Sequence, residues 1–89
     1  MIEHKLIIAE TYQIAHQWAL ANKWKLIPGM CFEHEDGSRM HYVHSKDTMA
    51  GRRRDTEVIV HDSWNNRPDR DELATEMLAK QMDVWHVGG

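Results

Sequence analysis

Two short apolar runs constrain most strongly what this chain can fold into. Residues 4–9 (HKLIIA) and 57–60 (EVIV) are rich in aliphatic and β-branched side chains, which is typical of strands covered on both faces, as in a parallel sheet. Each run is followed by helix signals, the order found in right-handed βαβ units. We therefore expect the two runs to lie side by side in the middle of a helix-covered sheet.

The first helix is expected over residues 11–22. Thr11 is the N-cap, because its hydroxyl can accept a hydrogen bond from a free backbone N–H of the first turn. The apolar residues of this segment fall on one helical stripe, as a helix packed on a sheet requires. They are Ile14, Ala15, Trp18 and Ala19.

The second helix carries the strongest local signals. Pro68 suits the first helical position, with Asn66 or Arg67 as the cap and acidic residues in the first turn to match the helix dipole. The helix should end near Gln81. Its expected core stripe consists of Leu73, Met77, Leu78 and Met82.

The segments between and after these elements predict shorter structures. Residues 24–32 form a short strand broken by Pro28 and Gly29, and Asp36 with Gly37 supplies a two-residue hairpin turn. Ser45 can cap one helical turn that Gly51 ends. Residues 84–87 (VWHV) predict a last strand, and residues 88–89 a frayed tail.

The 89 residues fit a single α/β domain, because so short a chain supports only one core. We expect a small open, mostly parallel sheet flanked by two main helices, with a β-hairpin inserted at about residues 24–41 and placed at one edge.

Composition restricts the compartment and the partners. The formal net charge of −3 gives no long-range attraction to nucleic acid or to an anionic membrane, and no apolar run is long enough to span a bilayer. Cys31 stands alone, which favours a reducing compartment. We expect a cytoplasmic protein without membrane partners.

Three segments resemble a group of small uncharacterised bacteriophage-encoded proteins with a Rossmann-like α/β unit. They are YVHSKDTMAG from Tyr42, TEVIVHDSW from Thr56 and NRPDRDELATEML from Asn66. The resemblance implies a phage origin and hence the host cytoplasm, but it lends no catalytic residue because these motifs mostly mark turns and helix starts. Residues 24–39 depart from the group as an insertion.

Polar residues follow the two central runs, at the sheet edge where open α/β folds bind ligands. Glu10 and Thr11 should meet His61, Asp62 and Ser63 there. His61 could act as acid/base with Glu10 or Asp62 orienting it, and Arg67 or Arg70 could hold an anionic substrate. The interpretation we favour is structural: Asp62 and Ser63 satisfy turn groups and Trp64 packs beneath the second helix.

Neither a metal nor a nucleotide cofactor is expected. Histidines and carboxylates crowd the hairpin, but His41 and His44 should point to opposite faces of a strand, which leaves only a pairing of His41 with His34. The chain has no HExxH motif. The turn after the first strand (ETYQ) is neither a GxGxxG nor a Walker loop, and Glu10 would repel phosphate.

The strongest basic patch is formed by Arg52, Arg53 and Arg54, with Arg39 near it and Tyr42 or Trp64 available for stacking. Since no catalytic set is complete, we favour a non-enzymatic protein that associates stoichiometrically with a protein partner through this loop and the hairpin. The partner could be a host factor or a second copy. A ligand-binding or hydrolytic domain around His61, and nucleic-acid binding through the arginines, stay open as alternatives.

Overall fold

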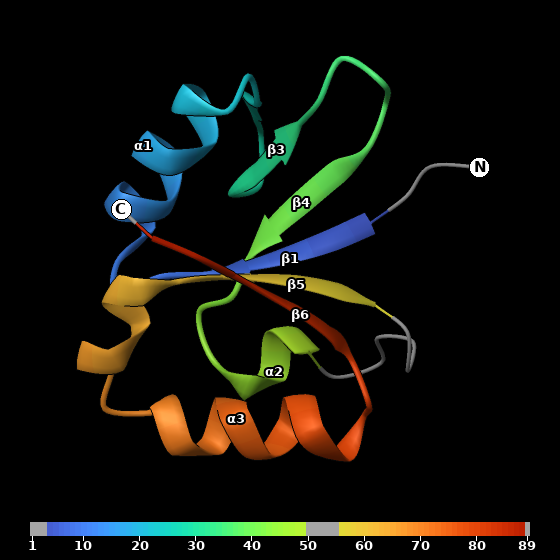
Figure 1. Ribbon diagram of the computed structural model, residues 1–89. Helices are drawn as coiled ribbons and strands as arrows, with labels where there is room; N and C mark the ends of the chain where they lie inside the picture. Colours follow the sequence, from blue (N-terminus) through green and yellow to red (C-terminus); the bar gives the residue numbers. More distant parts are fainter. Residues whose placement is uncertain (1–3, 50–55, 89) are drawn as a thin grey trace.

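The computed structural model describes residues 4–49 and 56–88 of the chain. Within these ranges the protein is an α/β fold with a six-stranded, mostly parallel mixed sheet and three α-helices (Figure 1). The elements in chain order are β1 (His4–Ile8), α1 (Tyr12–Ala21), β2 (Lys25–Ile27), β3 (Cys31–Glu33), β4 (Arg39–Tyr42), α2 (Lys46–Met49), β5 (Glu57–His61), the 3-10 helix η1 (Asp62–Asn66), α3 (Arg70–Ala79) and β6 (Asp83–Val87).

The sheet has the strand order β2-β3-β4-β1-β5-β6. Strand β1 lies in the middle and pairs in parallel with both β4 and β5, so the expected adjacency of the two apolar runs is confirmed. Strand β6 extends the parallel part beyond β5, while β2 and β3 continue from β4 as an antiparallel meander. The hairpin expected at the edge therefore shares β4 with the parallel part of the sheet.

Helices cover both faces of the sheet, giving three layers (Figure 1). Helix α1 packs with Ala15 and Ala19 on the face that carries Ile7 and Phe32. Thr11 caps this helix as predicted, because its hydroxyl accepts from the Ile14 N–H at 3.3 Å.

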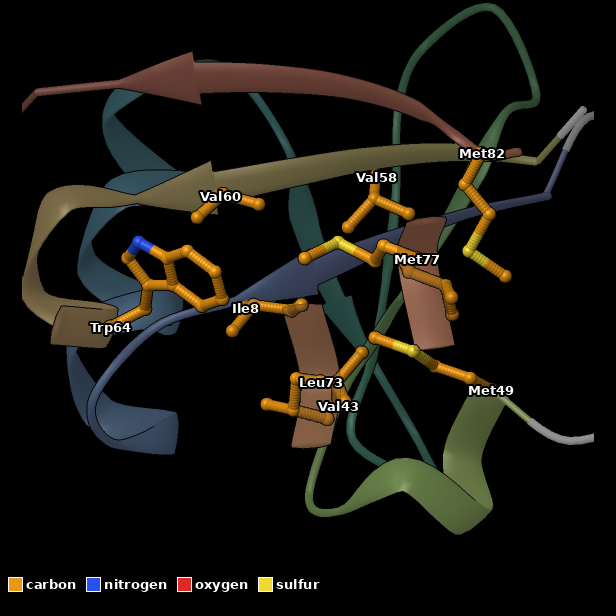
Figure 2. Packing of buried hydrophobic residues seen from close by; sticks show 10 residues of the cluster. Ile8, Val43, Met49, Val58, Val60, Trp64, Leu73, Met77 and Met82 are labelled. Carbon is orange, nitrogen blue, oxygen red and sulfur yellow. The ribbon is translucent and has the colours of Figure 1, made fainter. Parts of the chain in front are cut away.

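Helices α2 and α3 and the 3-10 helix cover the opposite face. Figure 2 shows Leu73 and Met77 of α3 pointing toward Val58 and Ile8 of the sheet, with Trp64 at one end of this cluster. Since apolar side chains fill both faces of β1, the central strand has no solvent-facing side beyond its first residues. No helix in the described part of the chain is long and apolar enough to cross a membrane.

The start of α3 differs from the prediction. The helix begins at Arg70 with Asp69 as N-cap and without a side-chain cap bond, so the assignment of the cap to Asn66 or Arg67 is wrong. Arg67 has an extended backbone (φ −76, ψ 136), which is the conformation favoured before a proline. Pro68 therefore lies in the turn that precedes the helix.

The core stripe of α3 is also narrower than predicted. Leu73, Met77 and Met82 are buried, but Leu78 is 81% exposed. At 3.6 residues per turn Leu78 lies about 140° around the helix from Leu73, whereas Met77 lies about 40° from it. Gly51, expected to end α2, and Gly89 of the expected tail lie outside the described residues.

Candidate functional site

The carboxyl ends of β1 and β4 form the place where a ligand would be expected in a fold of this kind. The two strands are parallel neighbours, and β1 leads into α1 on one face while β4 leads into α2 on the other. Such a reversal opens a crevice outside the strand ends, and open α/β sheets bind ligands in it.

The side chain of Arg67 occupies this crevice. Its Nη1 donates to the Ala9 carbonyl at 3.1 Å and the Val43 carbonyl at 2.7 Å, and its Nη2 donates to the His44 carbonyl at 2.6 Å. Asp69 accepts from Nε at 2.9 Å and from Nη2 at 3.0 Å. A guanidinium has five N–H donors, and here each has an acceptor within the chain. In this arrangement Arg67, named above as a holder of an anionic substrate, joins the strand ends instead.

The salt bridge to Asp69 makes the fold sensitive to acid. The hydrogen bonds from Arg67 hold the pKa of the Asp69 carboxyl below its usual value of 3.8. A carboxyl whose pKa is lowered by folding stabilises the fold above its unfolded pKa, and this contribution is lost as the pH falls through the folded pKa. We expect the Asp69→Asn protein to unfold at lower urea concentration than wild type at about pH 7, with a difference that shrinks below about pH 4. Urea titrations at several pH values measure this, and a constant difference would contradict it.

The two aromatic residues proposed for stacking are buried. Tyr42 packs against α1, its hydroxyl lies 3.4 Å from the Ala9 carbonyl, and burial raises the pKa of the Tyr42 phenol. Trp64 is 8% exposed and packs in the cluster beneath α3, as the structural interpretation expected. Neither ring offers a free face for a nucleobase in this arrangement.

The polar residues at the ends of β1 and β5 do converge. The Glu10 N–H donates to the Ser63 hydroxyl oxygen at 3.0 Å, and the Ser63 hydroxyl lies 2.9 Å from Nδ1 of His61. The same Nδ1 accepts from the Ser63 N–H at 3.1 Å, so His61 caps η1. Thr11 caps α1, and Asp62 is exposed. Thr11, His61 and Ser63 thus bond backbone N–H groups, which matches the structural interpretation of these residues more closely than acid/base chemistry.

His34 and His41 do not form the pair that the sequence left open. His34 lies 3.5 Å from the Asp36 carboxylate, His44 contacts the Tyr42 ring edge-on, and His41 contacts other residues. Among residues 4–49 and 56–88 there is no group of three or more side chains that could hold a metal ion.

The basic patch is only partly described. Arg52, Arg53 and Arg54 lie outside the described residues, so their predicted role stays a prediction. Arg39 forms an ion pair with Glu33 at 3.5 Å across the hairpin.

One cluster was missed by sequence reasoning. Cys31 Sγ lies 2.9 Å from Nδ1 of His41, and Nε2 of His41 lies 3.2 Å from Nδ1 of His4. These side chains come from three adjacent strands, β3, β4 and β1, and form a row across one face of the sheet. We call them the cysteine–histidine row.

The row depends on the length of the hairpin loop. A two-residue turn at Asp36 and Gly37 would place Cys31 opposite Tyr42. The loop instead has three residues, because His34 pairs with Ser38 and Gly37 alone adopts the left-handed conformation, at φ +90. The register shifts by one residue, and Cys31 lies opposite His41. The prediction of a two-residue turn is therefore wrong. With the predicted register, nothing in the sequence indicated that Cys31 and His41 are neighbours.

No family model, no curated protein and no solved structure matches this chain. The resemblance to phage-encoded proteins thus remains a prediction from the sequence.

Proposed function

We propose that this chain is a binding protein that takes up an extended segment of a protein partner along the outer edge of β6. The observation that supports the proposal most is the apolar exposure of this edge. Leu78 of α3 is 81% exposed and Val84 of β6 is 37% exposed, and both line the same groove. Trp85 is 59% exposed on the other face of β6. Contiguous exposed apolar residues of this size mark interaction sites in soluble proteins.

Strand β6 has the features of a template for strand addition. It pairs with β5 on one side, and no strand within the described residues pairs with its other side. Edge strands present unpaired N–H and C=O groups, and partners use them by adding a strand. Most residues of β6 are exposed, so a bound segment could reach its backbone.

A groove beside this edge would receive the side chains of the added segment. It has a volume of about 360 Å³ and lies between α3 and β6. Its lining includes Trp64, Met77, Met82 and Val84, with Leu78 at the solvent side. Methionine and tryptophan are enriched in interfaces because they offer adaptable apolar area. The groove therefore suits alternate apolar side chains of an extended peptide.

The charge around the groove indicates the chemistry of the partner. Helix α3, its two cap residues and the first residue of β6 carry more acidic than basic side chains: Asp69, Asp71, Glu72, Glu76 and Asp83 against Arg70 and Lys80. A second copy would bring the same acidic excess to the contact, and like charges oppose association. The partner segment is therefore apolar with basic flanks.

A selection of peptides tests this proposal. A displayed random library of nine-residue peptides is enriched on the immobilised protein, and we expect sequences that alternate apolar residues with Lys or Arg. Leu78→Ser and Trp85→Ser should each weaken binding of the enriched peptides about tenfold, or about 1.4 kcal/mol. Leu20→Ser is the matched control and should leave binding unchanged, because Leu20 is 54% exposed on α1, and α1 contacts β2 at the opposite edge of the sheet from β6.

Two outcomes would overturn the proposal. One is enrichment of peptides whose binding survives both substitutions near β6. The other is a concentration-dependent dimer of the free protein in sedimentation that Trp85→Ser disrupts, which would make a second copy the occupant. Alanine replacement of Arg52, Arg53 and Arg54 in the same assay tests the loop expected from the sequence, and unchanged binding would mean that the loop does not contact the peptide.

A further inference from the structure

The cysteine–histidine row has the geometry of an activated thiol. Cys31 and His41 are directly opposite each other in the β3–β4 pair, which fixes Sγ 2.9 Å from Nδ1. The His4 and His41 rings are nearly parallel, with centroids 5.4 Å apart and planes 23° apart. A nucleophile, a base within hydrogen-bond reach and a third group that orients the base are the elements of nucleophilic sites.

The contacts of the row form a consistent proton arrangement. When the thiol donates to Nδ1 of His41, the opposite Nε2–H of His41 donates to Nδ1 of His4, at 3.2 Å. His4 then holds His41 in the tautomer that accepts the thiol proton. The Gly29 carbonyl lies 3.2 Å from Sγ, a longer contact than that to His41.

The surroundings leave the thiol accessible. Cys31 is partly exposed and His4 is exposed, whereas cysteines enclosed in apolar cores are inert. The next residues on the same face of β3 and β4 are Glu33 and Arg39, whose charges offset each other in an ion pair. The row therefore has both a base for the thiol proton and access for a small reagent.

We propose that Cys31 is a modification site that exchanges with low-molecular-weight disulfides of the glutathione type. The thiol proton passes to Nδ1 of His41, and the Cys31 thiolate attacks one sulfur of the disulfide. A new S–S bond forms as the old one breaks, and the departing thiolate takes up a proton to become a free thiol. Cys31 is oxidised to a mixed disulfide and the reagent sulfur that leaves is reduced, so no other oxidant is required.

Glutathione disulfide is the probe for the test. The sequence contains one cysteine, so the mass increase of one glutathionyl group reports Cys31 alone. We expect the native protein at about pH 7 to react roughly fivefold or more faster than the same protein unfolded in urea, because a free thiol is only a few per cent ionised there. A native rate at or below the unfolded rate would overturn the proposal.

Substitutions locate the base. His41→Gln should lower the native rate to about that of the unfolded chain. His4→Gln should give an intermediate rate, as expected for a positioning residue. His34→Gln is the matched control, since His34 lies on the same hairpin but contacts Asp36, and it should react like wild type. Equal rates for wild type and His41→Gln would contradict the role of His41. None of these reactions needs a bound peptide, so they fail or succeed independently of the proposed strand addition.

Discussion

Replacing Arg67 with methionine is expected to lower the free energy of unfolding by about 3–5 kcal/mol. The side chain is 6% exposed and supplies hydrogen bonds to carbonyls at the ends of both β1 and β4. Methionine fills similar volume but leaves these carbonyls without donors, and it leaves Asp69 as an unpaired charge. Small domains are stable by only about 5–15 kcal/mol, so this single change removes a large share.

Urea denaturation followed by tryptophan fluorescence measures the loss. Arg70→Met is the matched control, because Arg70 is exposed and its guanidinium lies 5.6 Å from the Trp64 ring, a cation–π contact of about 1 kcal/mol at most. If Arg67→Met does not fold, Arg67→Lys gives a measurable intermediate, since lysine keeps the charge but lacks the planar fork. A loss below about 1 kcal/mol for Arg67→Met would contradict the role assigned to this residue.

The elements that local sequence signals define were predicted well. The aliphatic runs of β1 and β5 and the Thr11 cap of α1 need no information from elsewhere in the chain. Their adjacency also followed from the sequence, because a run that is apolar on both faces must lie inside a sheet with helices on either side. The convergence of Glu10 with Ser63 follows from that adjacency.

The role of Arg67 could not be predicted in the same way. The sequence Arg-Pro-Asp is typical of a helix start, so Arg67 was predicted as a possible N-cap of α3. The acceptors of its side chain are backbone carbonyls of Ala9, Val43 and His44, and a carbonyl leaves no mark in a sequence. Only the three-dimensional placement of two strand ends shows that an unoccupied crevice there would leave polar groups unsatisfied.

The cysteine–histidine row was missed because the length of the hairpin loop was predicted wrongly. Asp-Gly is a strong signal for a two-residue turn, and the chain instead uses a three-residue loop that places only Gly37 in the left-handed conformation. The two turns give strand pairings that differ by one residue. A shift of one residue changes which side chains of the two strands share a face. Local turn chemistry decided whether Cys31 meets His41 or Tyr42.

Substitutions in α3 are also expected to change the free energy of unfolding by very different amounts, because the two leucines predicted for its core stripe have opposite environments. Leu73 is fully buried and packs with Val58 and Ile8 on the sheet (Figure 2). Leu78, by contrast, is 81% exposed. We expect Leu73→Ala to lower the free energy of unfolding by about 2–5 kcal/mol, because the lost methyl groups leave a cavity between α3 and the sheet. Leu78→Ala should change it by no more than about 0.5 kcal/mol.

The pair is a matched comparison, because both substitutions remove the same atoms from the same helix and alanine favours helix at both positions. Urea denaturation of the two variants side by side measures the difference. Similar losses would mean that Leu78 is covered in the free protein, which would also remove it from the proposed peptide groove. If Leu78→Ala keeps full stability while the Leu78→Ser protein loses the enriched peptides, the exposure of this side chain serves binding rather than folding.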